Sequence, residues 1–333
     1  MGTSMYNYIL KYKRDDFIVT DDMELIFDNG DFYYYSLRKC GISTSQCLKE
    51  IAEEANISLS MIGYAGLKDE DGITEQYIST YQIKLNTIKS NIGEDNWFIL
   101  NFIGQGSVPI RIGKLRGNHF DITIRNVSDV ICKKIYNNCL DYCFINYYDS
   151  QRFRLAEKKK FAHKVGDALL QGDYDIALNL LFQGGNITEH EYLSSKMNSS
   201  EFWENNDPRF FTFFLNAFDA YKWNTQINTM MANLLTDYQI YYNDDFSYIF
   251  PIKNCSIDFH STSNMMRHRF NGRMIEENLV KREVIIKTKI TPYRYFYDTL
   301  LNNNCISINF FLPSGCYATM LVRQLMHHFA LEN

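Results

Sequence analysis

The sequence predicts an α+β fold in which a mainly helical domain is inserted into an α/β core. Three observations support this fold class. The apolar residues in the front part of the chain alternate as in strands, those from about residue 155 to residue 238 recur at helical spacing, and the tail returns to one strand and one helix. A host loop can accept such an insertion because the two ends of an inserted domain commonly lie close together.

The front part predicts several strands and one helix. Residues 31–37 are rich in aromatic side chains and favour a strand. A helix is expected next, with Thr44 as its capping residue and with apolar side chains at helical spacing, namely Cys47, Leu48, Ile51, Ala52 and Ala55. Further strands are predicted over residues 61–65, 77–85, 97–103 and 119–124, and a loop over 66–72 follows the first of them.

The spacing of the apolar residues changes twice in the rest of the chain, first in the middle and again in the tail. Helices are predicted around two apolar groups, Phe161, Val165, Ala168 and Leu169, and Trp223, Ile227, Met230, Met231 and Leu234. Thr291-Pro292 is expected to open another helix, because threonine caps helices and proline suits their first turn. The tail alternates as a strand over 306–312, and the turn at 313–315 should lead into a helix that holds Tyr317.

The composition is that of a soluble globular protein. Of the 333 residues, 46% are hydrophobic and 22% are charged, which is enough for a large core. No run of about 20 apolar residues could span a bilayer, and the N-terminus lacks a secretory signal, so we expect a cytoplasmic protein without membrane contact. The 8 cysteines never form a Cys-x-x-Cys pair. This spacing argues against a metal site or a redox pair and favours buried thiols.

The net charge of -5 contrasts with the basic character of most nucleic-acid-binding proteins. The cations are nevertheless clustered. Four clusters are Lys11, Lys13 and Arg14; Arg111, Lys114 and Arg116; Arg152, Arg154, Lys158, Lys159, Lys160 and Lys164; and Arg267, Arg269 and Arg273. Any one cluster is most often a solvated face. Four of them on a mildly acidic chain permit a basic groove without requiring one.

The segment 63–76 is the most informative stretch of the chain. An acidic run before a glycine, as at 69–72, is usually a solvated turn. A calcium-binding loop is excluded, because that motif requires glycine at its sixth position and glutamate at its twelfth. Counted from Asp69, these positions hold Thr74 and Thr80. The acidic turn and a specific catalytic motif remain as the two interpretations.

Five segments, in the same order, resemble motifs of the TruD family of pseudouridine synthases. Segment 63–76 resembles the family's G-[YF]-A-G-x-K-D-x-x-[AG]-[VI]-T-x-Q run. The other four resemble D-F-x-V at 16–19, L-x-G-N-x-F at 115–120, N-Y-F-G-x-Q-R-F-G at 146–153, and L-P-x-G-S-[YF]-A-T with a later arginine at 312–323. Five ordered motifs spread over the chain are far more specific than any one of them.

Some positions depart from the family pattern. Cys316 replaces the usual serine and Gln324 the usual glutamate, while Asp149 and Arg154 stand where glycines are common. A helical motif of the insertion is only loosely kept, at 217–224. None of these departures removes the acidic residue of segment 63–76, so they concern contacts with RNA more than catalysis.

The resemblance implies a fold and a function. The fold would be a pseudouridine-synthase core with a mixed, largely antiparallel sheet, made of residues 1–153 plus 288–333, interrupted by a mainly helical TRUD-type domain over 154–287, with the RNA cleft between the two. The function would be that of a tRNA pseudouridine synthase, an isomerase whose usual target is the uridine at position thirteen of tRNA. The implied partner is tRNA, with no cofactor and no metal, and we expect a monomer. The alternative is a non-catalytic RNA-binding protein or tRNA chaperone on the same fold.

Asp69 is the expected nucleophile. Converting uridine to pseudouridine breaks a C–N glycosidic bond and forms a C–C bond without redox change. A carboxylate suits this step because it is a metal-free nucleophile that can hold a covalent intermediate, as in retaining glycosidases. A nearby cation would keep it charged when the site closes. Lys68 and Arg323 are candidates, although Lys68 could equally face solvent and Arg323 could contact only phosphate.

The target base must leave its stack to reach this carboxylate. By resemblance, Phe17, Phe120 and Tyr317 form the walls of the base pocket and Asn118 hydrogen-bonds the base or the ribose. The remaining substrate contacts are expected from Lys68, Gln76, Gln151, Arg152 and Arg323. For the aromatic residues the alternative is ordinary core packing, because the chain holds 24 Phe and 24 Tyr. We expect the three walls to line one concavity with Asp69.

Overall fold

The computed structural model describes residues 7–93, 95–137, 139–155, 159–185, 187–188, 192–193, 196–243, 245–252 and 262–331. Lys158 and Cys255 lie outside these residues. By its internal contacts the chain divides into two units. The sheet unit holds the described parts of Tyr6–Tyr142 and Thr288–Gly315, and the helical unit those of Cys143–Lys287 and Cys316–Asn333. The C-terminal segment is thus grouped with the predicted insertion, and the domain limits at 153/154 and 287/288 stay a prediction.

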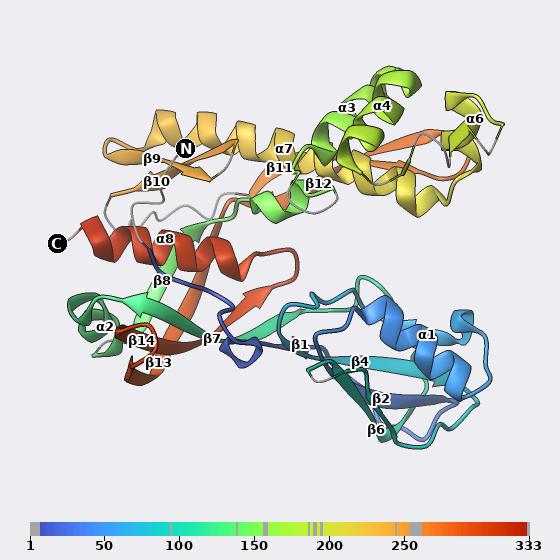
Figure 1. Cartoon of the computed structure of the whole chain (residues 1–333), viewed down its shortest axis with the longest axis horizontal. Coiled ribbons are helices and arrows are strands. Elements are labelled where there is room, and N and C mark those ends of the chain that lie inside the picture. Colours follow the sequence, from blue (N-terminus) through green and yellow to red (C-terminus); the bar gives the residue numbers. More distant parts are fainter. Residues whose placement is uncertain are drawn as a thin grey trace. The chain divides into compact units, whose positions relative to one another are not determined.

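The sheet unit is built on a ten-stranded sheet with the strand order β5-β6-β2-β4-β1-β7-β14-β13-β8 (Figure 1). In this order the strands are β5 (Ile88–Asn91), β6 (Trp97–Gly106), β2 (Phe32–Cys40), β4 (Ile73–Tyr81), β1 (Phe17–Asp22), β7 (Gly117–Val127), β14 (Asn303–Pro313), β13 (Ile285–Asp298) and β8 (Leu140–Ile145), while β3 (Ile62–Tyr64) pairs with β4. The division into units falls inside β8 and β13.

The sheet is mixed and largely antiparallel, as predicted. β1 pairs with β4 in parallel, whereas β7 pairs antiparallel with both β1 and β14, and β2 pairs antiparallel with both β4 and β6. Alternation of apolar and polar residues accounts for these strands, because successive side chains point to opposite faces. In β1, for example, Phe17, Val19 and Asp21 are buried and the residues between them are only partly so.

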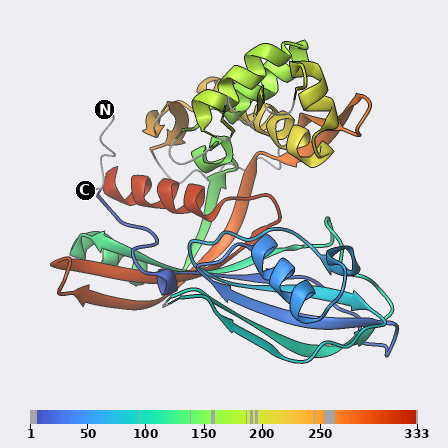
Figure 2. The ribbon, with the colours of Figure 1, turned by 45° about the vertical axis from the view of Figure 1, so that its right-hand side comes forward.

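One helix, α1 (Thr44–Glu54), covers one face of this sheet (Figures 1 and 2). Its buried residues Cys47, Leu48, Ile51 and Ala52 pack with side chains of β2, β4 and β6, which confirms the predicted helical face. The predicted cap is wrong, since Ser43 is the N-cap and accepts a hydrogen bond from the Gln46 amide at 3.2 Å. Thr44 is instead the first helical residue and its side chain is buried. A second helix, α2 (Asp129–Tyr136), follows β7.

The helix expected to open at Thr291-Pro292 is absent, and both residues lie inside β13. Alternating burial at Ile286, Thr288 and Ile290 shows that the strand period governs this segment. The pairing register with β14 shifts between Pro292 and Arg294. A proline without an amide hydrogen is tolerated at such an irregularity because no regular ladder bond is lost there. The local Thr-Pro signal was therefore overridden by sheet pairing.

The helical unit contains five described helices and two hairpins. The helices are α3 (Ala162–Gln171), α4 (Tyr174–Gly184), α6 (Ser199–Asn205), α7 (Pro208–Leu234) and α8 (Ala318–Leu331), and the hairpins are β9 (Tyr238–Asn243) with β10 (Phe246–Pro251) and β11 (Thr262–Phe270) with β12 (Ile275–Glu283). Both apolar groups predicted in the middle of the chain fall on helices, α3 and α7. α7 begins at Pro208, where the Asp207 side chain accepts from the Arg209 amide. Figure 2 shows α3, α4 and α7 in green and yellow, packed together.

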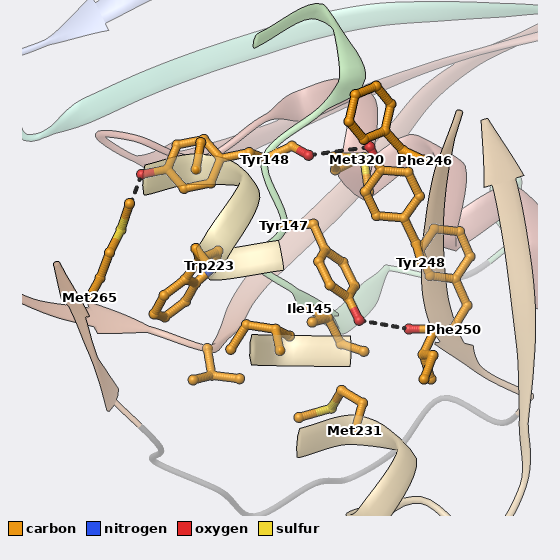
Figure 3. Close-up of a cluster of buried hydrophobic side chains, with 14 of the residues drawn as sticks. Ile145, Tyr147, Tyr148, Trp223, Met231, Phe246, Tyr248, Phe250, Met265 and Met320 are labelled. Carbon is orange, nitrogen blue, oxygen red and sulfur yellow. Dashed lines mark hydrogen bonds between the residues drawn. The ribbon is translucent and has the colours of Figure 1, made fainter. Parts of the chain in front are cut away.

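The segment that follows β8 forms part of the core of the helical unit. Tyr147 and Tyr148 are buried among side chains of α7, β10 and β11, including Trp223 (Figure 3). Asn224 on α7 accepts from the Tyr148 amide at 2.9 Å and donates to its carbonyl oxygen at 2.8 Å. Trp223 Nε1 donates to the Asn146 carbonyl oxygen at 2.9 Å. The 146–153 motif therefore holds its backbone against α7, which explains its aromatic residues by packing.

The described residues form neither a membrane-spanning helix nor a metal-binding cluster. Within the ranges that the structure describes, no helix is both long and apolar enough to cross a membrane. The same ranges contain no cluster of three or more His, Cys, Asp or Glu side chains placed to hold a metal ion. The described cysteines are free thiols, of which Cys40, Cys47, Cys132 and Cys305 are buried and Cys139 is exposed.

Candidate active site

Asp69 lies in the sheet unit, in the loop that joins β3 to β4. Its side chain is 57% exposed, so the carboxylate can be reached from solvent. The loop passes directly over the backbone of β1 at Gly72. A Cβ atom at this position would lie 2.5 Å from the Phe17 carbonyl oxygen, so any larger residue would push the loop away from β1. The glycine in this motif is therefore required by close packing of two backbone segments.

The buried side chains of Thr44 and Gln76 hold this loop in place through hydrogen bonds. The Thr44 hydroxyl accepts from the Lys68 amide at 3.0 Å and donates to Gln76 Oε1 at 2.9 Å. Gln76 Nε2 in turn donates to the Gly66 carbonyl oxygen at 3.3 Å. Gln76 is fully buried, although it was expected to contact substrate. In this structure its amide supports the loop, because both of its polar ends are used within the protein.

Lys39 is a second anchor, and the sequence analysis missed it. It is fully buried at the end of β2, and its ammonium donates to the carbonyl oxygens of Asp69 at 2.7 Å, Ile42 at 2.9 Å and Lys68 at 3.3 Å. A signal was present in the sequence. Strand alternation places Lys39 on the same face as Tyr35 and Leu37, which are in the core.

The cation beside Asp69 is Lys11. Its ammonium lies 3.3 Å from Asp69 Oδ2 and 4.5 Å from the centroid of the Phe17 ring. The Lys11 side chain is 21% exposed, so the pair is only partly shielded from water. Nothing in the sequence indicated this pair, because the two residues are 58 positions apart and meet only through the pairing of β1 with β4.

Lys68 contacts a different carboxylate from the one expected. Its ammonium forms short contacts with Asp21 and with the side-chain oxygen of Asn118. Burial raises the pKa of Asp21, and the charge of Lys68 opposes that rise. Lys68, Asp21 and Asn118 thus form a partly buried polar group that links the loop between β3 and β4 to β1 and β7. Lys68 supports the loop, and its charge already has a partner in Asp21.

The predicted wall residues of the sheet unit lie together on one face. Phe17 and Phe120 have ring centroids 6.2 Å apart in an edge-to-face arrangement, and Phe120 stacks on Phe310 at 5.3 Å. Pairing of β1, β7 and β14 explains this, since Val19 lies opposite Phe120 and Phe120 opposite Phe310. Phe17 and Phe120 are 5% and 8% exposed, so they form a nearly closed apolar layer next to the Lys11–Asp69 pair.

The other expected substrate residues belong to the helical unit. Tyr317 packs against Tyr148 with ring centroids 5.7 Å apart, and burial raises its pKa to about 12. Arg152 lies over the Phe213 ring at 5.4 Å, and Gln151 is exposed. The expectation that Tyr317 shares a concavity with Asp69 concerns residues of both units and stays a prediction.

Arg323, the second candidate cation, is paired within the helical unit. Its Nη1 lies 2.7 Å from Asp149 Oδ1, and the Thr319 hydroxyl forms a short bond with the other oxygen of Asp149. The departure at Asp149 is thereby explained, because this buried carboxylate neutralises Arg323. Gln324 is explained as well. Its amide accepts from the Ile145 amide at 2.8 Å and donates to the Ile145 carbonyl oxygen at 2.9 Å, and an ionised glutamate could not donate.

The two remaining departures differ in how far the structure explains them. Cys316 is partly buried, and burial raises its pKa to about 11, so the thiol is neutral at ordinary pH. A serine-sized, uncharged group is thus kept at this position. Nothing in the structure explains Arg154.

Known proteins similar to this chain agree on one family. The family model for tRNA pseudouridine synthase D (TruD) matches residues 2–212. A Thermococcus sibiricus protein named "Probable tRNA pseudouridine synthase D" is 37% identical over 175 residues, which cover 50% of this chain and 41% of that protein. A Methanococcus maripaludis protein named "Probable tRNA pseudouridine synthase D 1" is 33% identical over 186 residues, covering 55% and 46%. The chain thus spans about half the length of these curated relatives.

Two further similarities extend over nearly the whole chain. The tRNA pseudouridine synthase D of Aquifex aeolicus is 24% identical over 384 aligned positions, covering 95% of this chain and 97% of that protein. The crystal structure of a Methanosarcina mazei protein that carries the TruD name superposes with a TM-score of 0.58 at 16% identity, over 95% of this chain and 93% of the other, and shows the fold. With the family model covering more than half of the 333 residues, the chain belongs to the TruD family of tRNA pseudouridine synthases.

Proposed function

We propose that this chain converts a uridine of tRNA to pseudouridine, with Asp69 as the nucleophile and the uridine at position thirteen as the target. One observation carries the proposal: the exposed carboxylate of Asp69 is held next to the Lys11 ammonium, on a loop that is anchored by buried polar side chains. An ordinary solvated acidic turn needs no such support. The names of the relatives agree with tRNA as the substrate.

The chemistry is an isomerisation in which all atoms balance. A carboxylate oxygen of Asp69 attacks C1′ of the ribose, and the C1′–N1 bond breaks with its electron pair leaving on the uracil. The uracil then turns, C5 attacks C1′, and the carboxylate leaves again. The proton lost from C5 is replaced by one gained at N1, so nothing is oxidised, reduced or consumed. Lys11 stabilises the negative charge on the carboxylate before attack and after release.

Asn118 is suited to orient the base. Its side-chain oxygen accepts from Lys68, so the amide presents its N–H groups to any ligand. Uracil carries two carbonyl oxygens that accept such bonds. We infer that the Lys68–Asn118 contact fixes the amide in this orientation, and that Phe17, whose ring lies beside the Lys11 ammonium, provides an apolar contact for the base.

The direct test is pseudouridine formation in vitro. Unmodified tRNA is incubated with the protein, and pseudouridine is located by chemical labelling; a transcript with cytidine at position thirteen serves as the matched control. The proposal expects label at position thirteen of the first transcript and none in the control. Binding of tRNA without any label would contradict the enzyme and support the non-catalytic RNA-binding alternative. Label at another position would contradict only the assignment of the target.

The Lys11–Asp69 pair should affect turnover more than binding. Lys11→Met removes the cation that holds the carboxylate, and a misplacement of about 1 Å can cost on the order of a hundredfold in rate. We therefore expect a large fall in kcat with little change in the Kd for tRNA. The control is Lys13→Met, which removes the same charge two residues away from an exposed side chain. Equal kcat values for the two variants would show that the pair is an ordinary surface ion pair of little energetic weight.

Binding of tRNA should depend steeply on salt, despite the net charge of -5. Phosphate binding releases counterions, and neutralising about four phosphates predicts a loss of roughly a hundredfold in affinity between about 50 and about 200 mM salt. Arg111, Lys114 and Arg116 are exposed before β7 and are suited to such contacts. The measurement is the Kd for tRNA at several salt concentrations, with sodium chloride replaced by a neutral osmolyte as the control. A Kd that does not change with salt would contradict tRNA as the substrate.

A further inference from the structure

Lys39 is placed unusually for a lysine. It lies on the inward-facing side of β2, in line with Tyr35 and Leu37, and is 0% exposed. Lysines are almost never fully buried unless their charge is paired, because the ammonium loses its hydration. The hydrogen-bonding partners of Lys39 are three backbone carbonyl oxygens. An apolar side chain would fill this position without the cost of desolvating a charge. Packing alone therefore does not account for a lysine here.

The three carbonyl groups lie on the catalytic loop and on the segment that precedes α1. Two are those of Lys68 and Asp69, and the third is that of Ile42, in the turn that precedes α1. An ammonium has three N–H donors, so each donor has one acceptor. The bond to the Asp69 carbonyl oxygen, at 2.7 Å, is the shortest of the three. The backbone of the nucleophile is thereby tied to β2 and to the start of α1.

We propose that Lys39 is a positioning residue for the reaction: its ammonium fixes the backbone of Asp69, so that the otherwise exposed carboxylate meets the reacting carbon in one place. This inference rests on the proposed function. Asp69 is 57% exposed and has one weakly shielded cation beside it, so its side-chain contacts alone do not hold the loop. Thr44 acts on the neighbouring residue, Lys68, and leaves the carbonyl group of Asp69 to Lys39.

The protonation state of Lys39 gives a measurable test of the positioning role, because a side chain that served only for packing would not make turnover depend on its titration. Burial lowers the pKa of Lys39 to about 8, while the carboxylates of Asp69 and Glu70 on the loop act in the opposite direction; the thiols of Cys47 on α1 and Cys40 on β2 also face the ammonium. Above that pH the neutral amine keeps two N–H donors for three carbonyl groups. The loop should then lose one of its three bonds, and turnover should fall.

This fall in turnover can be distinguished from unfolding by its sign. The pKa of Lys39 in the folded protein, about 8, lies below the value of 10.5 for an exposed lysine, so the folded state releases this proton first. The contribution of Lys39 to the free energy of unfolding therefore rises with pH between these two values. A decrease of kcat in the same window cannot come from loss of stability at Lys39.

The experiment compares Lys39→Met with Arg38→Met. Arg38 is the neighbouring residue on β2, exposed on the opposite face, so its variant loses the same charge without touching the loop. For Lys39→Met we expect kcat to fall about a hundredfold, the cost of roughly 1 Å of misplacement, with the Kd for tRNA unchanged. Amide hydrogen exchange should become faster in a peptide covering 65–72 and stay slow in α1. Arg38→Met should behave as the wild type in all three measurements.

The pH profile completes the test. For the wild type and Arg38→Met, kcat should fall in a one-proton step near pH 8, and Lys39→Met should lack that step. Titration of the uridine itself affects all three proteins equally, so it cancels in their ratios. The inference is overturned if Lys39→Met keeps the wild-type kcat or if the wild type shows no step. Should Lys39→Met fail to fold, the wild-type profile and that of Lys39→Arg, which keeps its charge at all these pH values, decide the question.

Failure of the proposed function would have a different pattern. If the wild type forms no pseudouridine, the catalytic proposal is wrong whatever the Lys39 variants do. The hydrogen-exchange measurement would still show whether Lys39 holds the loop. Conversely, an active wild type that is inactivated by Asp69→Asn but unaffected by Lys39→Met would keep the function and reject the positioning role.

Discussion

Asp69→Asn should abolish pseudouridine formation while leaving the affinity for tRNA nearly unchanged. The asparagine has almost the same size, but it loses the negative charge and nearly all nucleophilicity. Binding rests on phosphate contacts and shape, to which one carboxylate adds nothing attractive, and removing a negative charge next to RNA should if anything tighten the complex slightly. The measurements are the Kd for tRNA and the yield of pseudouridine after long incubation.

The loop offers its own control for this prediction. Glu70 and Asp71 are exposed carboxylates next to Asp69 and could in principle replace it. The bonds from Lys39 and Thr44 fix the backbone at Asp69 and Lys68, so a neighbouring side chain cannot reach the same point without rebuilding the loop. Glu70→Gln should therefore keep the wild-type kcat. A rate near wild type for Asp69→Asn would show that another residue is the nucleophile.

Arg125→Met should destabilise the sheet unit strongly without a direct effect on the reaction. Arg125 on β7 donates to both carboxylate oxygens of Asp16 at 2.7 Å and forms a short contact with Asp298. Arg125 and Asp16 are 6% and 2% exposed. Removing the cation leaves Asp16 buried without its partner, and breaking a buried pair in this way costs roughly 3–5 kcal/mol. Urea unfolding, followed by hydrogen exchange in peptides of β1 and β7, should show the loss.

Arg116→Met is the matched control for the same substitution. Arg116 forms an ion pair with Asp22 at 2.7 Å, but its side chain is 59% exposed. Exposed pairs of this kind typically contribute about 0–1 kcal/mol, because water screens them and two long side chains must be ordered. Equal midpoints of unfolding for the two variants would mean that the Arg125 group contributes no more than a surface pair. Peptides of α7 in the helical unit should keep their protection in both.

The periodic parts of the fold were predictable from the sequence. Alternation of apolar residues over 306–312 in β14 and the helical spacing on α1 each report which face is buried, and burial on one face largely decides the element. Signals carried by one or two residues were weaker. Thr291-Pro292 favours a helix locally, but the alternation of buried residues around it favours a strand and prevails. At α1 the capping residue was displaced by one position, from Thr44 to Ser43, since both can cap.

The sequence could predict which residues belong to the candidate site, but not which charged residues pair with each other. Asp69, Phe17 and Asn118 were found through motifs, and the structure brings Phe17 and the Asp69 loop together. Which cation meets which carboxylate depends on strand pairing, and neighbours in sequence were misleading here: Lys68 adjoins Asp69 but contacts Asp21. Lys11 could be recognised only once β1 and β4 were placed in register, whereas alternation in β2 already placed Lys39 on the core face with Tyr35 and Leu37.

The parallel pairing of β1 with β4 determines when Asp69 acquires its cation during folding. A parallel pair cannot be joined by a tight turn and needs a long connection, which here contains β2, α1 and β3. Contacts between distant parts of a chain form slowly compared with local helices, because the entropy of closing the loop is lost first. Lys11 lies just before β1 and Asp69 just before β4, on the two sides of this junction. A newly made chain therefore carries its carboxylate unpaired until β1 and β4 have paired, so competence for the reaction should require this non-local contact and not only local structure.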